Sequence, residues 1–427
     1  MPELLTHFGT LLKLALRSAL NRRVSFCLTL LSVALSTCLL LTVQRGQQAI
    51  HESFTRAVSG TDLIIGARTS PLQLMLYAVF RLGDATHEIS WQSYQQIHDH
   101  PMVAWSIPMA LGDSHRGYPV LGTSQDYFRH FRYGQRQVLV IADGKVFDDI
   151  YDVVLGADVA KRLGYKLGDR LTLTHGTGSA PGIEHADKPF RVSGILAATG
   201  TPVDRTLHIS LEAMTAIHLN WQGGAPMPGV NIPADRVRAF DLQPEFITAA
   251  LVGLKSRAGV FNVQRLINLE MEEPLLAVLP AVALDQLWRL LDIVHRTLQA
   301  LSVLVLVISF CALVTALLAA LSQRRRELAM LRAVGARPLD LLCLLTLEGL
   351  LLTGGGALLG MALMSTGSAL AAPWLQTHWG IVWPVGELSA SEAEWLLMIT
   401  LAGPLTALLP AWWASRRALA DGLTMRL

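Results

Sequence analysis

Four long apolar runs restrict the fold of this chain more than any other feature of its 427 residues. They cover residues 24–43, 298–321, 341–375 and 395–413, and Glu348 is the only charged side chain within them. A helix needs about 20 apolar residues to cross a bilayer, and each run is about that long. Because backbone groups in lipid must hydrogen-bond within their own segment, these runs predict four membrane-spanning helices.

The segment between the first two runs has a different composition. The whole chain is 52% hydrophobic and 16% charged, but residues 44–296 have the composition of a soluble domain. We therefore predict an α+β membrane protein, with four transmembrane helices and a large mixed α/β extracytoplasmic domain inserted between the first and second. The predicted parts are a cytoplasmic-face amphipathic helix (1–21), the first span with its stalk (22–57), a membrane-proximal part of the outer domain (58–135), its β-rich core block (136–224), its returning part (225–280), a stalk with the second span (281–321), a cytoplasmic connector (322–340), the third span (341–375), a short outer loop (376–394), the fourth span (395–415) and a tail (416–427).

Basic residues predict the orientation of the chain. Arginines cluster before the first run, between the second and third, and after the fourth: Arg17, Arg22, Arg23, Arg324, Arg325, Arg326, Arg332, Arg337, Arg416, Arg417 and Arg426. The positive-inside rule places such clusters in the cytoplasm. We therefore expect both termini inside the cell and the large domain outside. The first run is expected to stay as an anchor and not to be cleaved as a signal peptide.

The connector between the second and third runs carries the most specific pattern, QRRRELAMLRAVGARP at residues 323–338. Each arginine would cost about 2.5–3.5 kcal/mol at the centre of a bilayer, so this segment is expected to lie outside the lipid. It resembles the connector of the FtsX-like/MacB permease family, a mechanotransmission (type VII) ABC class in which this segment couples to the ATPase. The resemblance implies ATPase-coupling roles for Arg324, Glu327, Leu328, Leu331, Arg332, Gly335 and Ala336.

Residues 138–211 resemble the outer-domain core of the same family. VVLGADVAKRLGYKLGDRLTLTHG predicts a strand, a short helix, a turn and another strand. FRVSGILAATGTPVDRTLHIS predicts two more strands. Gly156, Gly168, Asp169 and Gly194 match the family's turn positions, where we expect glycine to permit positive φ angles. The last stretch, LLPAWWASRRALADGLTMRL, also resembles the family terminus.

Periodicity predicts further helices. Residues 4–20 form an amphipathic pattern, suited to a helix on the inner membrane surface or to a cytoplasmic extension of the first span. The segment SPLQLMLYAVFRL (70–82) predicts an apolar helix that packs in the domain core or lies on the outer leaflet. Ser90 is expected to cap a helix that ends near His98.

Two patterns predict how helices pack. In the stalk before the second run, Leu287, Leu291 and Val294 recur at spacings of three and four, which places them on one stripe. We expect this stripe to face the stalk of the first span or a second copy of the chain. In the third run, Gly356 and Gly360 form a small-xxx-small pair, which lets helices approach closely within the subunit or between two copies.

No pattern in the chain predicts a catalytic centre. The motif G-x-x-x-x-G-K-[ST] does not occur, so this chain is not expected to hydrolyse ATP alone. The family resemblance implies that a partner ATPase holds ATP and Mg²⁺ and that this chain binds no cofactor. His98, Asp99 and His100 form the tightest histidine cluster, but their spacing fits no strong metal motif, so no metal site is predicted. Glu348 is expected to face the bundle interior, to reach the cytoplasmic interface or to pair with a connector arginine. A proton-relay role is the alternative.

The family resemblance implies a function. It implies a multi-pass permease subunit of a bacterial inner-membrane ABC transporter with a periplasmic domain. A separate ATPase and a second copy, or a related permease, would be its partners. It would convert ATP hydrolysis into periplasmic movement, for export or extraction of a lipoprotein, lipid, peptide or small molecule. The alternative is a non-transporting regulator that activates a periplasmic cell-wall hydrolase. A periplasmic adaptor, lipoprotein or hydrolase would be a further partner, and no nucleic acid is expected.

Overall fold

The computed structural model forms two compact units. The structure describes residues 13–14, 23–57, 59–83, 85–176, 182–222, 225–230, 232–323, 330, 337–379, 383–386 and 388–417. The helical unit comprises Met1–Ala49, Asp292–Trp374 and Trp383–Leu427, and the sheet unit comprises Ile50–Leu291 and Leu375–Val382. The amphipathic pattern at residues 4–20 lies outside the described residues except for residues 13 and 14.

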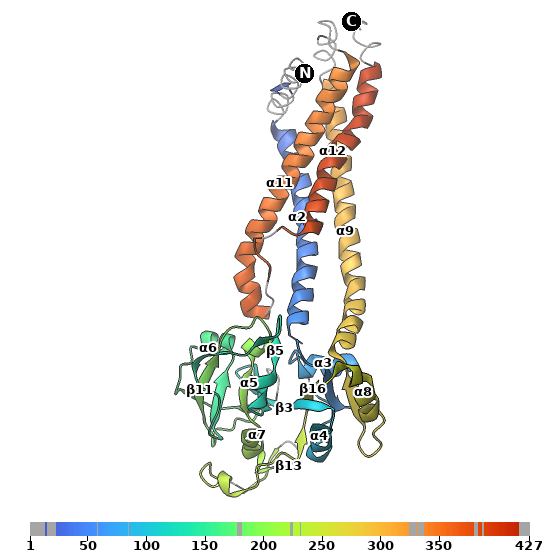
Figure 1. The fold of residues 1–427 in the computed structure, drawn as a ribbon. Helices are drawn as coiled ribbons and strands as arrows, with labels where there is room; N and C mark the ends of the chain where they lie inside the picture. The colour runs from blue at the N-terminus through green and yellow to red at the C-terminus, as the bar shows by residue number, and fades with distance from the viewer. Residues whose placement is uncertain are drawn as a thin grey trace. The chain divides into compact units, whose positions relative to one another are not determined.

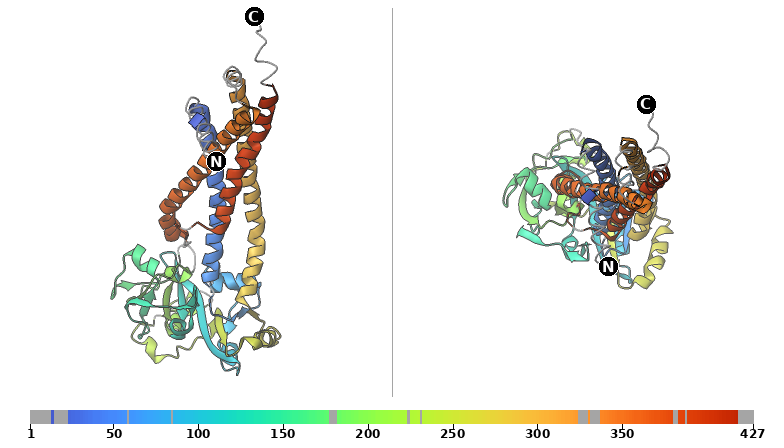
Figure 2. Two further views of the ribbon diagram at one scale, coloured as in Figure 1. Left: turned by 45° about the horizontal axis from the view of Figure 1, so that its top comes forward. Right: turned by 90° about the horizontal axis from the view of Figure 1, so that it is seen from above.

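The helical unit is built from four long helices that run side by side (Figures 1 and 2). Their bounds are α2 Arg23–Arg56, α9 Pro280–Gln323, α11 Pro338–Trp379 and α12 Ala390–Arg417. All four contribute to one buried apolar cluster, which contains Val33, Leu40, Leu306, Ala357 and Ile399. Each helix has a stretch that is long and apolar enough to cross a membrane, so the predicted helices are confirmed.

The sheet unit is organised around one mixed sheet of eleven strands, in the order β17-β1-β16-β3-β4-β12-β8-β11-β7, with β10 beside β3 and β9 beside β11. The pairs β8–β11 and β4–β12 are parallel, and the other pairs are antiparallel. The strands are β1 Leu63–Ala67, β3 Val103–His115, β4 Tyr118–Thr123, β7 Ile141–Gly144, β8 Asp152–Leu155, β9 Arg170–Leu171, β10 Thr174–His175, β11 Phe190–Leu196, β12 Leu207–Ser210, β16 Ala249–Leu254 and β17 Leu275–Val278. The sheet therefore runs through the boundaries that we predicted at 135/136 and 224/225, and the β-rich block is part of a larger sheet.

Three two-stranded ladders and nine short helices complete the sheet unit in the part of the chain that the structure describes. The ladders pair β2 Ile89–Ser90 with β15 Phe246–Ile247, β5 Arg132–Tyr133 with β6 Gln137–Val138, and β13 Trp221–Gln222 with β14 Ala225–Pro226. The helices are α3 Pro71–Ala78, α4 Trp91–His98, α5 Asp126–His130, α6 Ala157–Leu163, α7 Leu211–His218, α8 Val260–Asn268 and the 3₁₀ turns η1 Pro202–Arg205, η2 Val237–Ala239 and η3 Arg257–Gly259.

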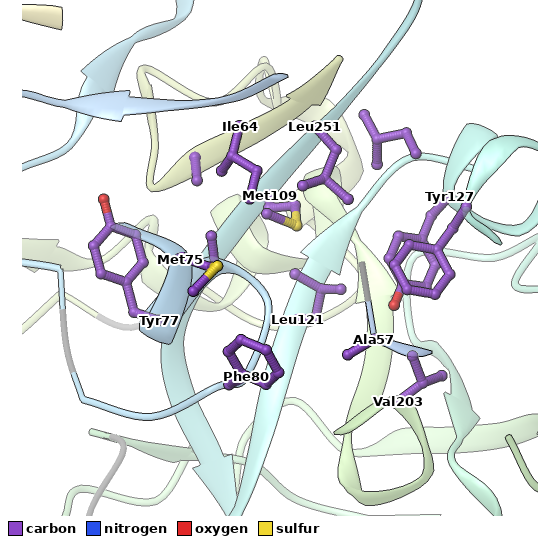
Figure 3. Packing of buried hydrophobic residues seen from close by; sticks show 14 of the residues in the cluster. Ala57, Ile64, Met75, Tyr77, Phe80, Met109, Leu121, Tyr127, Val203 and Leu251 are labelled. Atoms are coloured by element: carbon purple, nitrogen blue, oxygen red, sulfur yellow. The ribbon is translucent and has the colours of Figure 1, made fainter. Parts of the chain in front are cut away.

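Two of the helix predictions are confirmed in detail. The Ser90 hydroxyl accepts a hydrogen bond from the Ser93 backbone N–H at 3.2 Å, so it caps α4 as expected. In α3, Leu74 and Met75 are completely buried. Figure 3 shows Met75 beside Ile64, Met109 and Phe80 in the main core cluster. The apolar segment therefore packs in the core.

The expected role of the turn glycines is correct at only one of three positions. Gly168 has a φ of +85°, which favours glycine. Gly156 has a φ of −66°, and Gly194 lies in β11 without a positive φ. A Cβ at Gly156 would lie 2.3 Å from the Val203 carbonyl oxygen, and one at Gly194 would lie 2.3 Å from that of Lys145. Both positions thus need glycine because another backbone segment passes too close for any side chain. Asp169 does belong to a turn, since its carboxylate accepts from the Lys166 N–H at 2.8 Å.

Candidate functional site

Two helix ends are built into the core of the sheet unit. The last turns of α2 and the first turns of α9 belong to this unit, because its main segment begins at residue 50 and ends at residue 291. The Phe54 ring lies 4.4 Å from Phe80 and 5.7 Å from Trp288 between centroids. Leu284 and Leu287 belong to the same buried cluster as Phe80. These two helix ends therefore form part of the apolar core of the sheet unit.

The predicted stalk stripe divides into a buried and an exposed part. The side chain of Leu287 is 9% exposed, whereas Leu291 is 36% and Val294 is 56% exposed in the single chain. Leu287 thus packs inside the sheet unit beside residues near the end of α2. Leu291 and Val294 keep exposed apolar surface in the single chain. This exposure is compatible with the alternative that the stripe faces a second copy of the chain.

The two glycines of the third run lie against α2 of the same chain. A Cβ at Gly356 would lie 2.7 Å from Val33 Cγ1, and one at Gly360 would lie 2.5 Å from the Ala34 carbonyl oxygen. Side chains larger than hydrogen would force α2 and α11 apart at these points. This close approach occupies the glycine face inside the subunit.

An ion pair that the sequence reasoning missed joins α2 to the start of α12. Arg45 Nε and Nη2 donate to Glu392 Oε1 and Oε2, each at 2.7 Å, and the two side chains are only 4% and 1% exposed. The Ser389 hydroxyl accepts from the Glu392 N–H, and the Glu392 carboxylate accepts from the Ser389 N–H. The sequence Ser-Ala-Ser-Glu before an apolar run is a capping-box pattern and could have indicated this helix start.

The predicted coupling residues lie outside the described part of the chain. This applies to Arg324, Glu327, Leu328, Leu331, Arg332, Gly335 and Ala336. Glu348 is described and is buried, as expected for an acidic side chain that faces the bundle interior.

A pocket of about 320 Å³ in the sheet unit is lined mainly by basic side chains. The Trp105 and His130 rings stack on its wall with their centroids 5.5 Å apart. The lining residues are Gly60, Asp62, Trp105, His130, Arg132, Arg136, Leu254, Lys255 and Arg257. Four of them carry a positive charge and one a negative charge, so the pocket suits an anionic group.

The structure gathers histidines that the sequence did not connect. His98 and His100, which formed the tightest sequence cluster, bond separately to the Ser106 hydroxyl and the Met102 N–H. Asp113, His175, His185 and His218 instead converge, with one potential ligand atom from each lying within 4.8 Å of all the others. No short spacing links these four positions, so only the fold could reveal the group.

The electrostatics of this group reflect its burial. Burial opposes ionisation of Asp113, but hydrogen bonds from His175 and His218 outweigh it and lower the pKa of this carboxyl to about 2. Burial also lowers the pKa of His185 to about 4. Burial also tends to lower the pKa of His218, but the nearby Asp113 carboxylate outweighs this effect, so the pKa of His218 is raised.

Comparisons with known proteins found family models that match large parts of the chain. A family model described as the MacB-like periplasmic core domain matches residues 28–245, and one described as the FtsX-like permease C-terminal region matches residues 300–422. A search among curated proteins found no match. Two solved structures resemble the chain at 12% identity, both with low TM-scores. The periplasmic region of MacB from Actinobacillus actinomycetemcomitans has a TM-score of 0.33 and covers 54% of this chain and 94% of that one. The extracellular domain of the noncanonic ABC-type transporter YknZ from Gram-positive bacteria has a TM-score of 0.29 and covers 51% and 99%. The assignment therefore depends on the two family models.

Proposed function

This chain belongs to the MacB/FtsX-like family of ABC permeases, and we propose that it transmits the ATP-driven movement of a separate ATPase to its periplasmic domain. The family consists of inner-membrane permeases with a periplasmic domain, and the four apolar helices and the mixed sheet agree with that membership. In this proposal the sheet unit is the moving output, and it acts on cargo at the outer face of the membrane. Lipoproteins, lipids, peptides and small molecules are the cargo classes that such an arrangement suits.

One observation supports transmission above all others. Helix α9 continues without interruption from Pro280 to Gln323, and α2 from Arg23 to Arg56. Their apolar stretches suit the membrane, while Phe54, Leu284 and Trp288 pack in the sheet unit. A hydrogen-bonded helix keeps a rise of about 1.5 Å per residue and resists bending, so it can carry a displacement along its axis. Neither α2 nor α9 beyond its first residue contains a proline, the residue that most strongly kinks a helix.

The input would come through the connector at residues 322–340. Its basic, helix-compatible sequence and its family pattern support docking of a separate ATPase there. Arg332→Glu and Gly335→Pro should each abolish ATPase association without preventing membrane insertion. Arg116→Glu is the matched control, because it makes the same charge change at an exposed turn of the sheet unit. If the ATPase co-purifies and is fully stimulated with both connector variants, it docks elsewhere.

Transmission itself is tested by breaking the stalk. Two glycines inserted after Asp292 should interrupt α9 between the two units and shift the helix register by more than half a turn. We expect the ATPase to remain active in nanodiscs while the cellular function is lost. The same insertion after Gly229, in an exposed turn of the sheet unit, serves as control. Normal cellular function of the Asp292 insertion would show that no rigid link is needed.

Leu291→Asp offers a milder test of the same link. Leu291 lies at the end of the sheet unit's main segment and is partly exposed in the single chain. If a second copy covers it, a carboxylate there would have to be desolvated, at a cost of several kcal/mol. Arg289→Ala, at an exposed position on the same helix, provides the control. We expect Leu291→Asp to weaken self-association and to uncouple ATP hydrolysis from cellular function. An unchanged oligomeric state would show that Leu291 does not contact a second copy of the chain.

A further inference from the structure

A partly buried group of one carboxylate and three imidazoles lies at the end of strand β3, in the sheet unit. Asp113 is on β3, and His175 stands directly opposite it on β10 in the antiparallel register. Directly opposed residues on paired strands project to the same face of the sheet. His218 is the last residue of α7, and His185 lies in the segment that leads to β11. Four separate parts of the chain thus each contribute one side chain that can bind a metal ion.

The separations between these side chains match those around a metal ion. His175 Nδ1 lies 3.0 Å from Asp113 Oδ1 and 3.1 Å from His218 Nε2. His218 Nε2 lies 3.5 Å from Asp113 Oδ1. A tetrahedral zinc ion with bonds of about 2.0–2.2 Å holds its ligand atoms about 3.3–3.6 Å apart. Three of the four donors therefore already stand near the positions that such an ion requires.

Hydrogen bonding to the outer ring nitrogen favours metal binding by His218. Its Nδ1 lies 2.9 Å from the Met214 carbonyl oxygen and must donate to it, because a carbonyl can only accept. In the neutral imidazole, Nε2 then carries a lone pair that points into the group. This arrangement, in which the second nitrogen is held by a backbone carbonyl, is the usual support of a metal-binding histidine.

Two buried polar atoms of the group have no partner among the described residues. They are Asp113 Oδ2 and His185 Nε2. Buried polar atoms are nearly always hydrogen-bonded, so each such atom requires an explanation. A single cation at the centre would interact with the carboxylate and give the imidazoles a common partner.

The surroundings suit a closed site. The Trp221 ring lies beside all three imidazoles, with centroids at 4.6 Å from His175, 4.8 Å from His185 and 5.3 Å from His218. The nearby Lys188 is buried, but its ammonium group pairs with the Asp187 carboxylate at 2.8 Å. Lys188 is therefore not paired with Asp113, whose carboxylate contacts His175 and His218 and supplies negative charge that favours a cation. His175 and His218 are partly exposed and leave a path for the ion.

We propose that Asp113, His175, His185 and His218 bind one divalent transition-metal ion, of which Zn²⁺ fits best. Imidazole nitrogens with one carboxylate are typical zinc ligands, and four protein ligands without an open position are typical of a structural site. The ion would connect β3, β10, α7 and the segment before β11. This inference stands apart from the proposed transmission function, because it concerns only the sheet unit and needs no ATPase.

The test uses the full chain, purified in detergent and freed of metal by a chelator, and Co²⁺ as the first probe. Tetrahedral Co²⁺ absorbs visible light strongly, so we expect one equivalent to give this spectrum and Zn²⁺ to displace it. His175→Ala combined with His218→Ala should weaken binding by roughly 100-fold or more. His87→Ala combined with His100→Ala removes the same number of imidazoles outside the group and should leave binding unchanged. Equal binding by the two double variants would overturn the proposal.

A second variant guards against simple misfolding. His175→Cys replaces one zinc ligand by another and should keep one equivalent of Co²⁺, with an added thiolate-to-cobalt absorption band. Zn²⁺ should raise the unfolding temperature of the wild type and of His175→Cys, since a ligand that binds only the folded state stabilises it. Co²⁺ should also quench tryptophan emission, and Trp221→Phe should reduce that quenching without changing the stoichiometry. Absence of the thiolate band, or of any tetrahedral Co²⁺ spectrum in the wild type, would refute the site.

Discussion

A methyl group added at Gly360 should leave the chain less stable than one added at Gly367 on the same helix. A Cβ at Gly360 would lie 2.5 Å from the Ala34 carbonyl oxygen and 2.8 Å from Thr37 Cβ. Since the nearest atom belongs to the backbone of α2, the helices must separate to make room. A Cβ at Gly367 would meet nothing within 4 Å, so Gly367→Ala is a control with the same chemistry.

The magnitudes follow from two opposing effects. Replacing glycine by alanine inside a helix stabilises it by about 1 kcal/mol. Overpacking a tight contact costs about 1–3 kcal/mol. Gly367→Ala should therefore be stabilising by up to about 1 kcal/mol, and Gly360→Ala should be neutral to destabilising by about 2 kcal/mol. The difference between the two variants, about 1–3 kcal/mol, is the quantity that reports the helix contact.

The assay is thermal unfolding of both variants and the wild type in one detergent. For a unit of roughly 150–250 residues, 1 kcal/mol changes Tm by about 2–4 °C, so the two variants should differ by several degrees. Gly360→Leu should lower Tm further. Gly356→Ala should fall between the two alanine variants, because it meets the Val33 side chain first. Equal Tm values for Gly360→Ala and Gly367→Ala would refute the close packing of α2 on α11.

Three other predictions concern the buried charges and the orientation of the chain. Glu392→Gln removes the negative charge that pairs with the buried Arg45 guanidinium, so it should lower the free energy of unfolding by about 3–5 kcal/mol. Replacing both residues by leucine should lower it much less, and thermal unfolding of the two variants measures the difference. Burial is the main cause that lowers the pKa of His208 to about 3 in the folded state. The unfolded state binds a proton at this side chain below about pH 6.5, whereas the folded state does not bind it until the pH is much lower. Stability should therefore fall as the pH drops from about 6.5 towards 3, and His208→Asn should flatten this dependence in melts recorded across that range. In a cysteine-free background, a cysteine at Ser179 should react with an impermeant thiol reagent in intact cells, and one at Ser322 should react only after lysis; the reverse labelling would contradict the orientation derived from the arginines.

Local sequence patterns predicted the elements well wherever one physical effect dominated. The four spans followed from uninterrupted apolar length, and the Ser90 cap followed from a hydroxyl placed before a helix. Strand β8 before Gly156 and strand β9 after Gly168 followed from turn signals. Such signals act over a few residues, so a single sequence contains all the information that they need.

Contacts between distant residues could not be predicted in the same way. The sequence left two positions open for the 70–82 helix, and burial of Met75 decided between them. It also gave the wrong reason for Gly156, because the nearby Val203 carbonyl comes from another segment. The Arg45–Glu392 pair joins residues at opposite ends of the chain, and neither residue alone indicates the other.

The sequence alone determined that this chain has four helices apolar enough to span a membrane and one large α/β domain inserted between the first and second, and its motifs indicated the family. These properties depend on composition and on short spacings, which are present before the chain folds. The tertiary structure alone decided which glycine face meets α2 and which histidines meet Asp113. Strand pairing placed His175 opposite Asp113, and helix α7 placed His218 beside both. Contacts of this kind depend on the order of strands in the sheet and on how whole helices and strands pack, and a local sequence pattern does not contain this information.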